Sequence, residues 1–177
     1  MHVMLDTNVV LRAVRELLSP SVTRPIAVRC PRKGIHRLRP RPSRGQRVES
    51  LHALMVTLFN CELTPVAGPR LLEEYERNLR RYHDDCWKLR DVVSLLRLRC
   101  KVVRPDEELV KLCRDAHPKG DSADAEHAAV CLQTNAVLLT FDPHFSEISA
   151  RLEKGGEPLT VLDPYNFLCR VTGSRGE

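Results

Sequence analysis

Short apolar runs alternate with longer stretches of helical periodicity along almost the whole chain. The runs are four to six residues long and are bounded by turn-forming residues, which predicts buried strands at 2–5, 61–66, 100–103, 136–140 and 159–162. Between them, apolar residues recur at every third or fourth position, which predicts helices at 9–18, 48–59, 70–82, 87–98, 105–116, 121–133, 144–153 and 164–171. Strands that alternate with helices form βαβ units, so we expect an α/β fold with a mainly parallel sheet of about five strands.

Two features depart from this alternation. Pro65 lies in the second strand, and proline cannot donate a hydrogen bond to a neighbouring strand, so we expect that strand to lie at the sheet edge or to end early. The segment from Ser19 to Arg47 contains five prolines and few aliphatic residues. We therefore expect an irregular insertion, at about residues 19–47, in a single domain that spans residues 1–172.

The basic residues are concentrated in this insertion. Eight arginines and one lysine lie between Leu17 and Val48 without any acidic residue, although the whole chain carries a net charge of only +5. The segment could be an arm that binds RNA, since arginines neutralise phosphates. It could equally be a disordered insertion without a function, or the product of a frame error in the coding sequence. The sequence leaves all three interpretations open.

Composition and absent motifs exclude several classes of protein. Hydrophobic residues make up 42% of the 177 residues and charged residues 29%, as in soluble globular domains. No apolar run approaches the roughly 20 residues of a membrane helix, and the N-terminus lacks a secretory pattern. The seven cysteines are scattered without a CxxC pair, so we expect a cytoplasmic protein with reduced thiols and no membrane partner. The chain has no Walker A loop, GxGxxG loop, GxSxG elbow or zinc-ligand spacing.

Acidic residues stand where strands end and where helices begin. Asp6 follows the first strand, Asp142 follows the fourth, and Asp124 opens the helix before the fourth strand. Glu73 and Glu74 lie in the first turns of the helix after the second strand. In a parallel sheet these positions share one edge, where carboxylates repel one another unless a cation such as Mg²⁺ or Mn²⁺ lies between them. An acidic metal pocket in a chain with a basic segment indicates hydrolysis of nucleic acid.

Each acid also has a purely structural interpretation. Asp6 could cap the helix that begins near Val9, and Asp121 is a good N-cap with Asp124 three residues further on. The glutamates could form a solvated helix face, and Asp142 before proline is a common turn opener. For Asp121 we favour the helix cap. For the other acids, the case for a site rests on their joint placement.

Four stretches of the chain resemble a PIN domain, the fold of the VapC-type toxins. They are VMLDTNVVLRA at the N-terminus, LLEEYERNL, DAEHAAVCLQTNAVLLTFDPHF, and LTVLDPYNFL near the C-terminus. The resemblance covers nearly the whole chain except about residues 15–47. It implies a three-layer α/β/α sandwich with a mainly parallel central sheet of about five strands.

The resemblance also implies a set of site residues and a cofactor. The implied catalytic and metal-binding residues are Asp6, Glu74 (with Glu73 as its alternative), Asp124 and Asp142. The implied auxiliary residues are Asn8, Asp121 and Thr140. The cofactor would be Mg²⁺ or Mn²⁺, and Asn8 would orient Asp6 or a water.

Activity and partners follow from the same resemblance. Family members are metal-dependent ribonucleases, which implies cleavage of RNA to products with a 5′-phosphate and a 3′-hydroxyl. It also implies the toxin of a toxin–antitoxin pair, a cognate antitoxin protein as partner, and a homodimer. One alternative is a non-catalytic PIN-like domain that binds RNA or a protein partner through the 19–47 segment. Another is a phosphatase of the haloacid dehalogenase type, but that class needs a second aspartate where this chain has Asn8.

Overall fold

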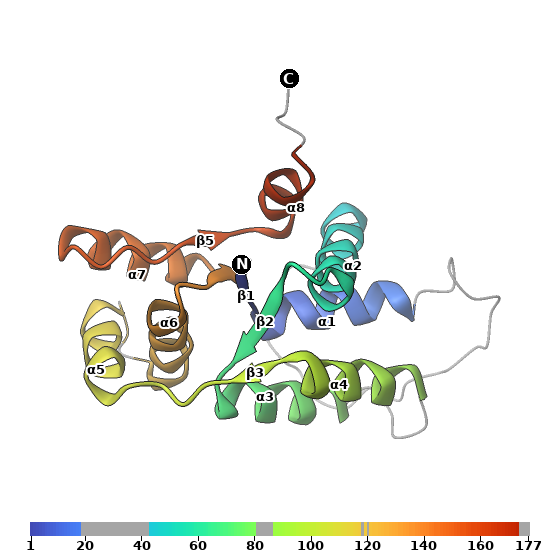
Figure 1. Ribbon diagram of the computed structural model, residues 1–177, viewed down its shortest axis with the longest axis horizontal. Coiled ribbons are helices and arrows are strands. Elements are labelled where there is room, and N and C mark those ends of the chain that lie inside the picture. The colour runs from blue at the N-terminus through green and yellow to red at the C-terminus, as the bar shows by residue number, and fades with distance from the viewer. Residues whose placement is uncertain (19–42, 81–86, 118, 120, 174–177) are drawn as a thin grey trace, which may run out of the picture.

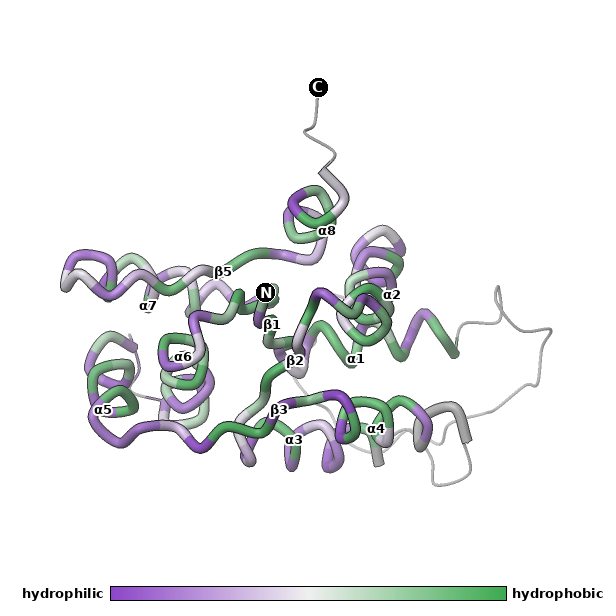
Figure 2. Tube along the Cα trace, in the orientation of Figure 1, coloured by the Kyte–Doolittle hydropathy of each residue, from purple (hydrophilic) through white to green (hydrophobic). Residues whose placement is uncertain are grey.

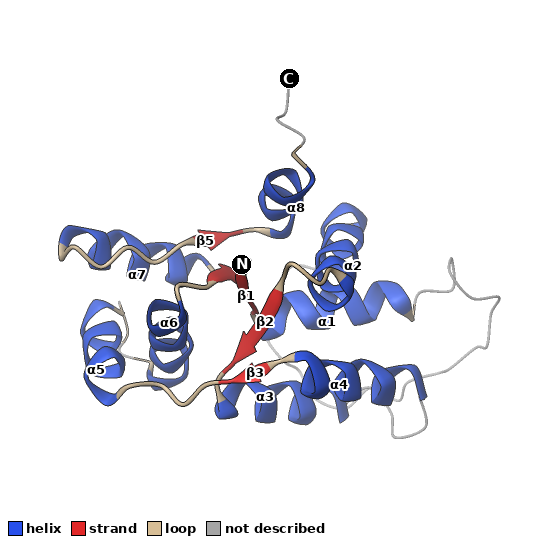
Figure 3. Ribbon diagram, viewed as in Figure 1, coloured by secondary structure: helices blue, strands red, loops and turns tan. Residues whose placement is uncertain are grey.

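Five parallel strands form the central sheet of the protein. The structure is a computed structural model that describes residues 1–18, 43–80, 87–117, 119 and 121–173. The strands are β1 (His2–Leu5), β2 (Thr64–Ala67), β3 (Lys101–Val102), β4 (Val137–Leu139) and β5 (Val161–Leu162). Their order across the sheet is β3-β2-β1-β4-β5, and every neighbouring pair is parallel (Figure 3). The predicted parallel sheet of five strands is confirmed.

Helices cover both faces of this sheet. They are α1 (Thr7–Leu17), α2 (Arg44–Phe59), α3 (Pro69–Arg80), α4 (Trp87–Arg99), α5 (Glu107–Ala116), α6 (Ser122–Thr134), α7 (Pro143–Lys154) and α8 (Pro164–Thr172). In Figure 1, α5, α6 and α7 lie on one side of the sheet and α1, α2 and α4 on the other. The predicted three-layer α/β/α sandwich is therefore confirmed. In the described ranges, no helix combines the length and the hydropathy needed to cross a bilayer.

The core lies around β1, β4 and the helices packed on them. Val3, Met4 and Leu138 are fully buried, and β1, which carries the first two, is coloured mainly as hydrophobic in Figure 2. Helix α6 buries several alanines, among them Ala125 and Ala128, whose small side chains let a helix approach a sheet closely. The cysteines of the described residues are free thiols, as predicted.

The prediction that the second strand would lie at the sheet edge is wrong. β2 lies between β1 and β3, and it begins at Thr64 rather than at residue 61. The Thr64 amide donates to Met1 O at 2.9 Å. Because alternate amides of a strand point to the same side, the nitrogen of Pro65 points away from β1. Pairing with β3 starts only at Val66. The missing N–H of Pro65 therefore costs no hydrogen bond between β2 and either neighbouring strand.

Two helices begin at least two residues earlier than predicted, because local hydrogen bonds extend them. α1 begins at Thr7 rather than at residue 9, and α2 begins at Arg44 rather than at residue 48. At α2, Ser43 Oγ accepts from the Gln46 amide and Gln46 Oε1 accepts from the Ser43 amide, a capping box. The last residues of the predicted insertion thus belong to a helix, and the remainder of it, residues 19–42, lies outside the described residues.

Replacement of Ser43 by alanine tests where α2 begins. Ser43→Ala removes the acceptor for the Gln46 amide, and loss of such a cap costs about 1 kcal/mol. We expect the free energy of unfolding in urea to fall by about that amount. Ser43→Asp keeps a capping oxygen and should unfold like the wild type. If Ser43→Ala is neutral, the helix does not begin at this residue.

The direction in which strands are added to the sheet reverses beside β1. The chain passes from β1 through α1 and α2 to β2 on one side, and later returns from the edge strand β3 to β4 on the other side. In parallel α/β sheets, ligands bind outside the carboxyl ends of the strands at such a switch point. The residues that follow β1 and β4 are therefore the first place to look for a site.

Candidate metal-binding site

Asp6 stands directly after β1 and is held against the end of β4. Its amide donates to Leu139 O at 2.9 Å, and the residue is only 9% exposed. By position Asp6 is the N-cap residue of α1, but its side chain makes no capping hydrogen bond. Instead Oδ2 accepts from Thr140 Oγ1 at 2.6 Å and from Asn8 Nδ2. The interpretation of Asp6 as an ordinary helix cap therefore does not describe its side chain.

Asn8 and Thr140 join the ends of β1 and β4 through their side chains. Asn8 Nδ2 donates to Thr140 Oγ1 at 3.1 Å, and Asn8 Oδ1 accepts from the Phe141 amide at 3.2 Å. Thr140 Oγ1 also accepts from the Asp142 amide at 2.9 Å. This network fixes Asp6 and the backbone at Asp142 relative to each other.

The Asp142 side chain caps a helix and also contacts a histidine. It is the N-cap of α7, where Oδ1 accepts from the His144 amide at 3.0 Å. The same oxygen lies 3.3 Å from His144 Nδ1. Oδ2 takes no part in either contact, and about 30% of the side chain is exposed. Asp142 therefore caps a helix and still presents carboxylate oxygen to solvent.

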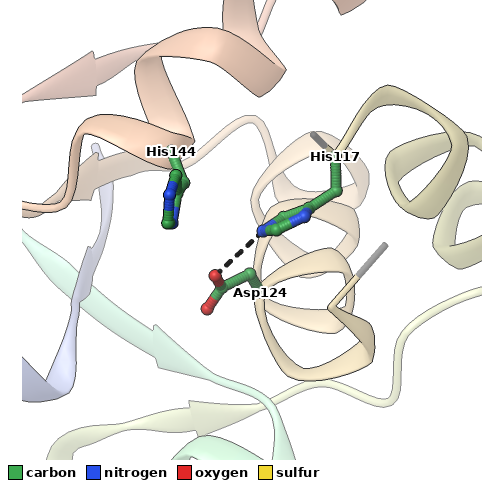
Figure 4. Close-up of side chains that lie close together, drawn as sticks. All are labelled: His117, Asp124 and His144. Carbon is green, nitrogen blue, oxygen red and sulfur yellow. Dashed lines mark hydrogen bonds and ion pairs between the residues drawn. The ribbon is translucent and has the colours of Figure 1, made fainter. Parts of the chain in front are cut away.

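Asp124 lies in the first turn of α6 and contacts a histidine that precedes the helix. His117 Nε2 is 3.2 Å from Asp124 Oδ2 (Figure 4). His117 is buried, and its Nδ1 accepts from the amides of Lys119 at 2.9 Å and Asp121 at 3.2 Å. Asp121 itself is exposed and caps α6 by accepting from the Ala123 amide at 2.7 Å, so the favoured cap interpretation is confirmed.

Sequence reasoning missed His117. It follows a helix, precedes a proline and a glycine, and matches no motif, so it looked like an ordinary loop residue. Its contact with Asp124 depends on the turn that brings the Lys119 and Asp121 amides onto its ring. Spacing alone gives no signal of such a turn.

Glu74 approaches the same region from α3. Thr7 Oγ1 donates to Glu74 Oε2 at 3.0 Å, and His127 Nε2 on α6 lies 4.0 Å from Glu74 Oε1. Glu74 thus lies between the residue after Asp6 and the helix of Asp124. Glu73, the alternative, is exposed. Both glutamates line a cleft of about 340 Å³, together with Pro69, Arg70, Arg77, Pro105 and Glu126.

Burial and neighbouring carboxylates raise the pKa values of Asp6 and Asp124. Burial raises the pKa of Asp6 from 3.8 to about 7, and the negative charges of Asp124 and Asp142 add to that rise. Burial likewise raises the pKa of Asp124, with smaller contributions from the charges of Asp121 and Asp142, whereas the hydrogen bond from His117 lowers it. A cation bound between such carboxylates stabilises their ionised form and so lowers their pKa values. Carboxylate oxygens are the ligands that a hard divalent ion such as Mg²⁺ or Mn²⁺ prefers. Among the described residues, however, Asp6 and Asp142 do not belong to the group whose ligand atoms lie within 4.8 Å of one another.

A second combination of ligand atoms lies at the same place. One ligand atom each of His117, Asp124 and His144 lie within 4.8 Å of one another (Figure 4). The two imidazole rings have centroids 5.6 Å apart and are inclined by 60°. Asp124 therefore lies near two imidazoles and also within reach of the charges of Asp121 and Asp142.

Comparison with known proteins identifies the family. A profile described as PIN domain matches residues 51–151, more than half of the chain. Among solved structures, VapBC2 from Rickettsia felis bound to a DNA fragment from their promoter is similar, with a TM-score of 0.54 and 14% identity over 92% of this chain and 98% of that chain. VapBC-1 from nontypeable Haemophilus influenzae has a TM-score of 0.52 and 18% identity over 93% and 99%. The search of curated proteins found no match. With the profile match and the shared fold together, the chain belongs to the PIN domain family.

Proposed function

We propose that this PIN domain is a metal-dependent endoribonuclease that hydrolyses RNA phosphodiester bonds. The observation that carries the proposal is the convergence of acids from four separate elements at the switch point of the sheet. Asp6, Asp124 and Asp142 would hold Mg²⁺ or Mn²⁺, and Glu74 would complete the set. The charges of Asp124 and Asp142, which raise the pKa of Asp6 beyond the larger effect of burial, support this assignment.

The cation and the side chains around it would have different roles in the reaction. The bound cation would offset charge that develops on the phosphodiester and lower the pKa of water. The Thr140 hydroxyl and the Asn8 amide hold Asp6 in one orientation, so its carboxylate does not have to reorganise when substrate binds. Glu74, held by Thr7, would accept a proton or position a water at the edge of the cleft.

The proposed partners are an RNA substrate and an antitoxin protein. We propose that the chain is the toxin of a toxin–antitoxin pair, acts in the cytoplasm and forms a homodimer. The support is its fold similarity, over nearly full length, to chains from VapBC structures. Co-expression with a neighbouring small gene, followed by affinity purification, would test the pairing. A toxic chain that stays toxic when every neighbouring gene is co-expressed would contradict it.

The nuclease assignment has a direct test. Purified protein is incubated with single-stranded and structured RNA in Mn²⁺, in Mg²⁺ and in EDTA, and the product ends are mapped. We expect cleavage only with metal, leaving 5′-phosphate and 3′-hydroxyl ends. RNA binding without any cleavage would favour the non-catalytic alternative, in which the basic segment provides the affinity. Deletion of residues 19–42, which spares the cap and first turn of α2, should then abolish binding, whereas a nuclease should retain cleavage.

Arg12 should contact the RNA backbone beside the site. Its guanidinium lies over the Phe141 ring, 3.8 Å from the centroid, and Phe141 immediately precedes Asp142. We expect Arg12→Gln to weaken RNA binding about tenfold, the effect of one charge-assisted hydrogen bond, and to lower the salt slope by about 1. Arg12→Lys keeps the charge and should retain the salt slope. If Arg12→Gln leaves both quantities unchanged, Arg12 does not contact phosphate.

A further inference from the structure

His117 is a buried side chain beside Asp124 that the carboxylate site does not use. We infer that His117 is a hydrogen-bond donor with a fixed tautomer that positions Asp124, and that it is not a metal ligand. The role of Asp124 rests on the proposed function, whereas the tautomer of His117 stands on hydrogen bonds alone. His117 therefore does not bind a metal, although its ring lies close to Asp124 and His144.

The tautomer follows from two main-chain amides. The Lys119 amide donates to His117 Nδ1 at 2.9 Å, and the Asp121 amide donates to the same nitrogen at 3.2 Å. A ring nitrogen that accepts N–H bonds carries no proton. A neutral imidazole carries one proton, so it lies on Nε2. That nitrogen faces Asp124 Oδ2 at 3.2 Å, and it therefore donates to the carboxylate.

The same hydrogen bonds exclude His117 as a metal ligand. A metal at Nε2 would require that nitrogen to lose its proton, which would leave the ring without a proton on either nitrogen. Histidines that bind metals instead donate their second N–H to a neighbouring acceptor. Here the second nitrogen faces two donors. Proximity of His117, Asp124 and His144 within 4.8 Å therefore does not make a three-ligand site.

The surrounding structure holds His117 in place. Its side chain is 1% exposed, and its own amide donates to Arg114 O at 3.1 Å at the end of α5. The preceding carbonyl, Ala116 O, accepts from Arg151 of α7 at 3.1 Å. His117 uses one acceptor position on Oδ2 of Asp124, and a carboxylate has about four such positions, so the hydrogen bond orients Asp124 and leaves carboxylate oxygen for a cation.

The first experiment measures the tautomer without metal. Nitrogen-15 NMR of the imidazole rings is recorded on the metal-free protein at pH 8, and the His117 signals are identified by their loss in His117→Gln. We expect a protonated Nε2 and an unprotonated Nδ1. A proton on Nδ1 would overturn the inference. This readout is independent of nuclease activity, so it separates a failure of the inference from a failure of the proposed function.

The second experiment separates a positioning residue from a ligand. Glutamine can place an N–H near the position of Nε2, whereas leucine fills the space without a donor. We expect His117→Leu to weaken Mn²⁺ binding about tenfold or more, as loss of a hydrogen bond to a ligand does, and His117→Gln to restore the affinity largely. Equal losses in both variants would indicate a direct ligand and overturn the inference. Mn²⁺ affinity is measured by calorimetry, and thermal melting of each metal-free variant checks that it folds.

A third experiment detects coordination of the metal directly, so an unfolded variant cannot give the same result. Pulsed EPR of bound Mn²⁺ detects nitrogen that coordinates the ion directly. The nitrogen signal should be the same in wild type and His117→Gln, because His117 does not contact the metal. His144→Gln is the matched control, since His144 lies on the other side of Asp124 in Figure 4. A signal that disappears only in His117→Gln would show coordination by His117 and contradict the inference.

Discussion

Asp6→Asn should lower metal-dependent RNA cleavage about a hundredfold or more. Asp6 is the most enclosed of the proposed ligands, and its carboxylate is fixed by Thr140 and Asn8. Asparagine keeps the size and one acceptor oxygen but removes the negative charge that would hold the cation. We expect Asp124→Asn to behave in the same way. Cleavage of RNA in Mn²⁺, measured under single-turnover conditions, gives the comparison.

The matched control for this loss is Asp106→Asn. Asp106 is exposed and caps α5 by accepting from the amides of Glu108 at 2.9 Å and Leu109 at 3.2 Å. Asparagine caps helices as well as aspartate does, so the control changes one charge and leaves the fold intact. Its cleavage rate should equal that of the wild type. If Asp6→Asn and Asp124→Asn also cleave at the wild-type rate, the catalytic assignment is wrong.

The metal-free protein should lose stability as the pH rises from about 4 to about 7. The pKa of Asp6 is about 7 in the folded protein and 3.8 as its ordinary value, so the folded state holds the proton more tightly than the unfolded state does. The stabilisation from this proton is complete below pH 3.8 and is lost as the pH rises through about 7. One pKa unit corresponds to about 1.4 kcal/mol, so the total change is about 4 kcal/mol.

The difference between wild type and Asp6→Asn isolates this effect. Urea unfolding is measured from pH 4.5 to 8.5 in EDTA, and the free energy of the variant is subtracted at each pH. The subtraction removes contributions common to both proteins, including that of His127, whose pKa is lowered to about 4 by burial. We expect the wild type to become less stable relative to the variant as the pH rises. A difference that does not change with pH would contradict the raised pKa.

At high pH, metal should stabilise the wild type more than Asp6→Asn. A ligand that binds only the folded state raises its stability, and the proposed site binds a cation only when its carboxylates are ionised. At pH 8, millimolar Mn²⁺ should therefore raise the melting temperature of the wild type and leave Asp6→Asn nearly unchanged. The increase for the wild type should be smaller at pH 5.5. An equal increase in both proteins would place the bound metal elsewhere.

Much of the fold was predictable because its strands are apolar runs with sharp ends. β4 and the last three residues of β1 are buried and apolar, as in strands covered on both faces, and the acids that follow the two strands mark where they stop. The placement of β2 was mispredicted because a proline's effect depends on which side of the strand its nitrogen faces. That side depends on how two strands pair, and the sequence of one strand does not determine the pairing.

The site was predictable in its acids but not in the groups that hold them. Asp6, Asp124 and Asp142 stand at element ends, and the βαβ rule brings such ends to one edge. The contact between Thr7 and Glu74 joins residues 67 positions apart, and the one between Thr140 and Asp6 joins residues 134 apart. Such contacts depend on helix orientation and side-chain rotamers, which periodicity does not specify.

The pair formed by Arg47 and Glu16 joins the two helices that flank residues 19–42. Arg47 Nε on α2 lies 3.2 Å from Glu16 Oε2 on α1, and Glu16 is buried. The two helices pack together along much of their length, so they are held together by contacts outside that segment. The entropy of closing a loop grows only slowly with its length. Two separately expressed fragments, residues 1–18 and 43–177, should therefore reassemble, which would make this junction suitable for a split reporter.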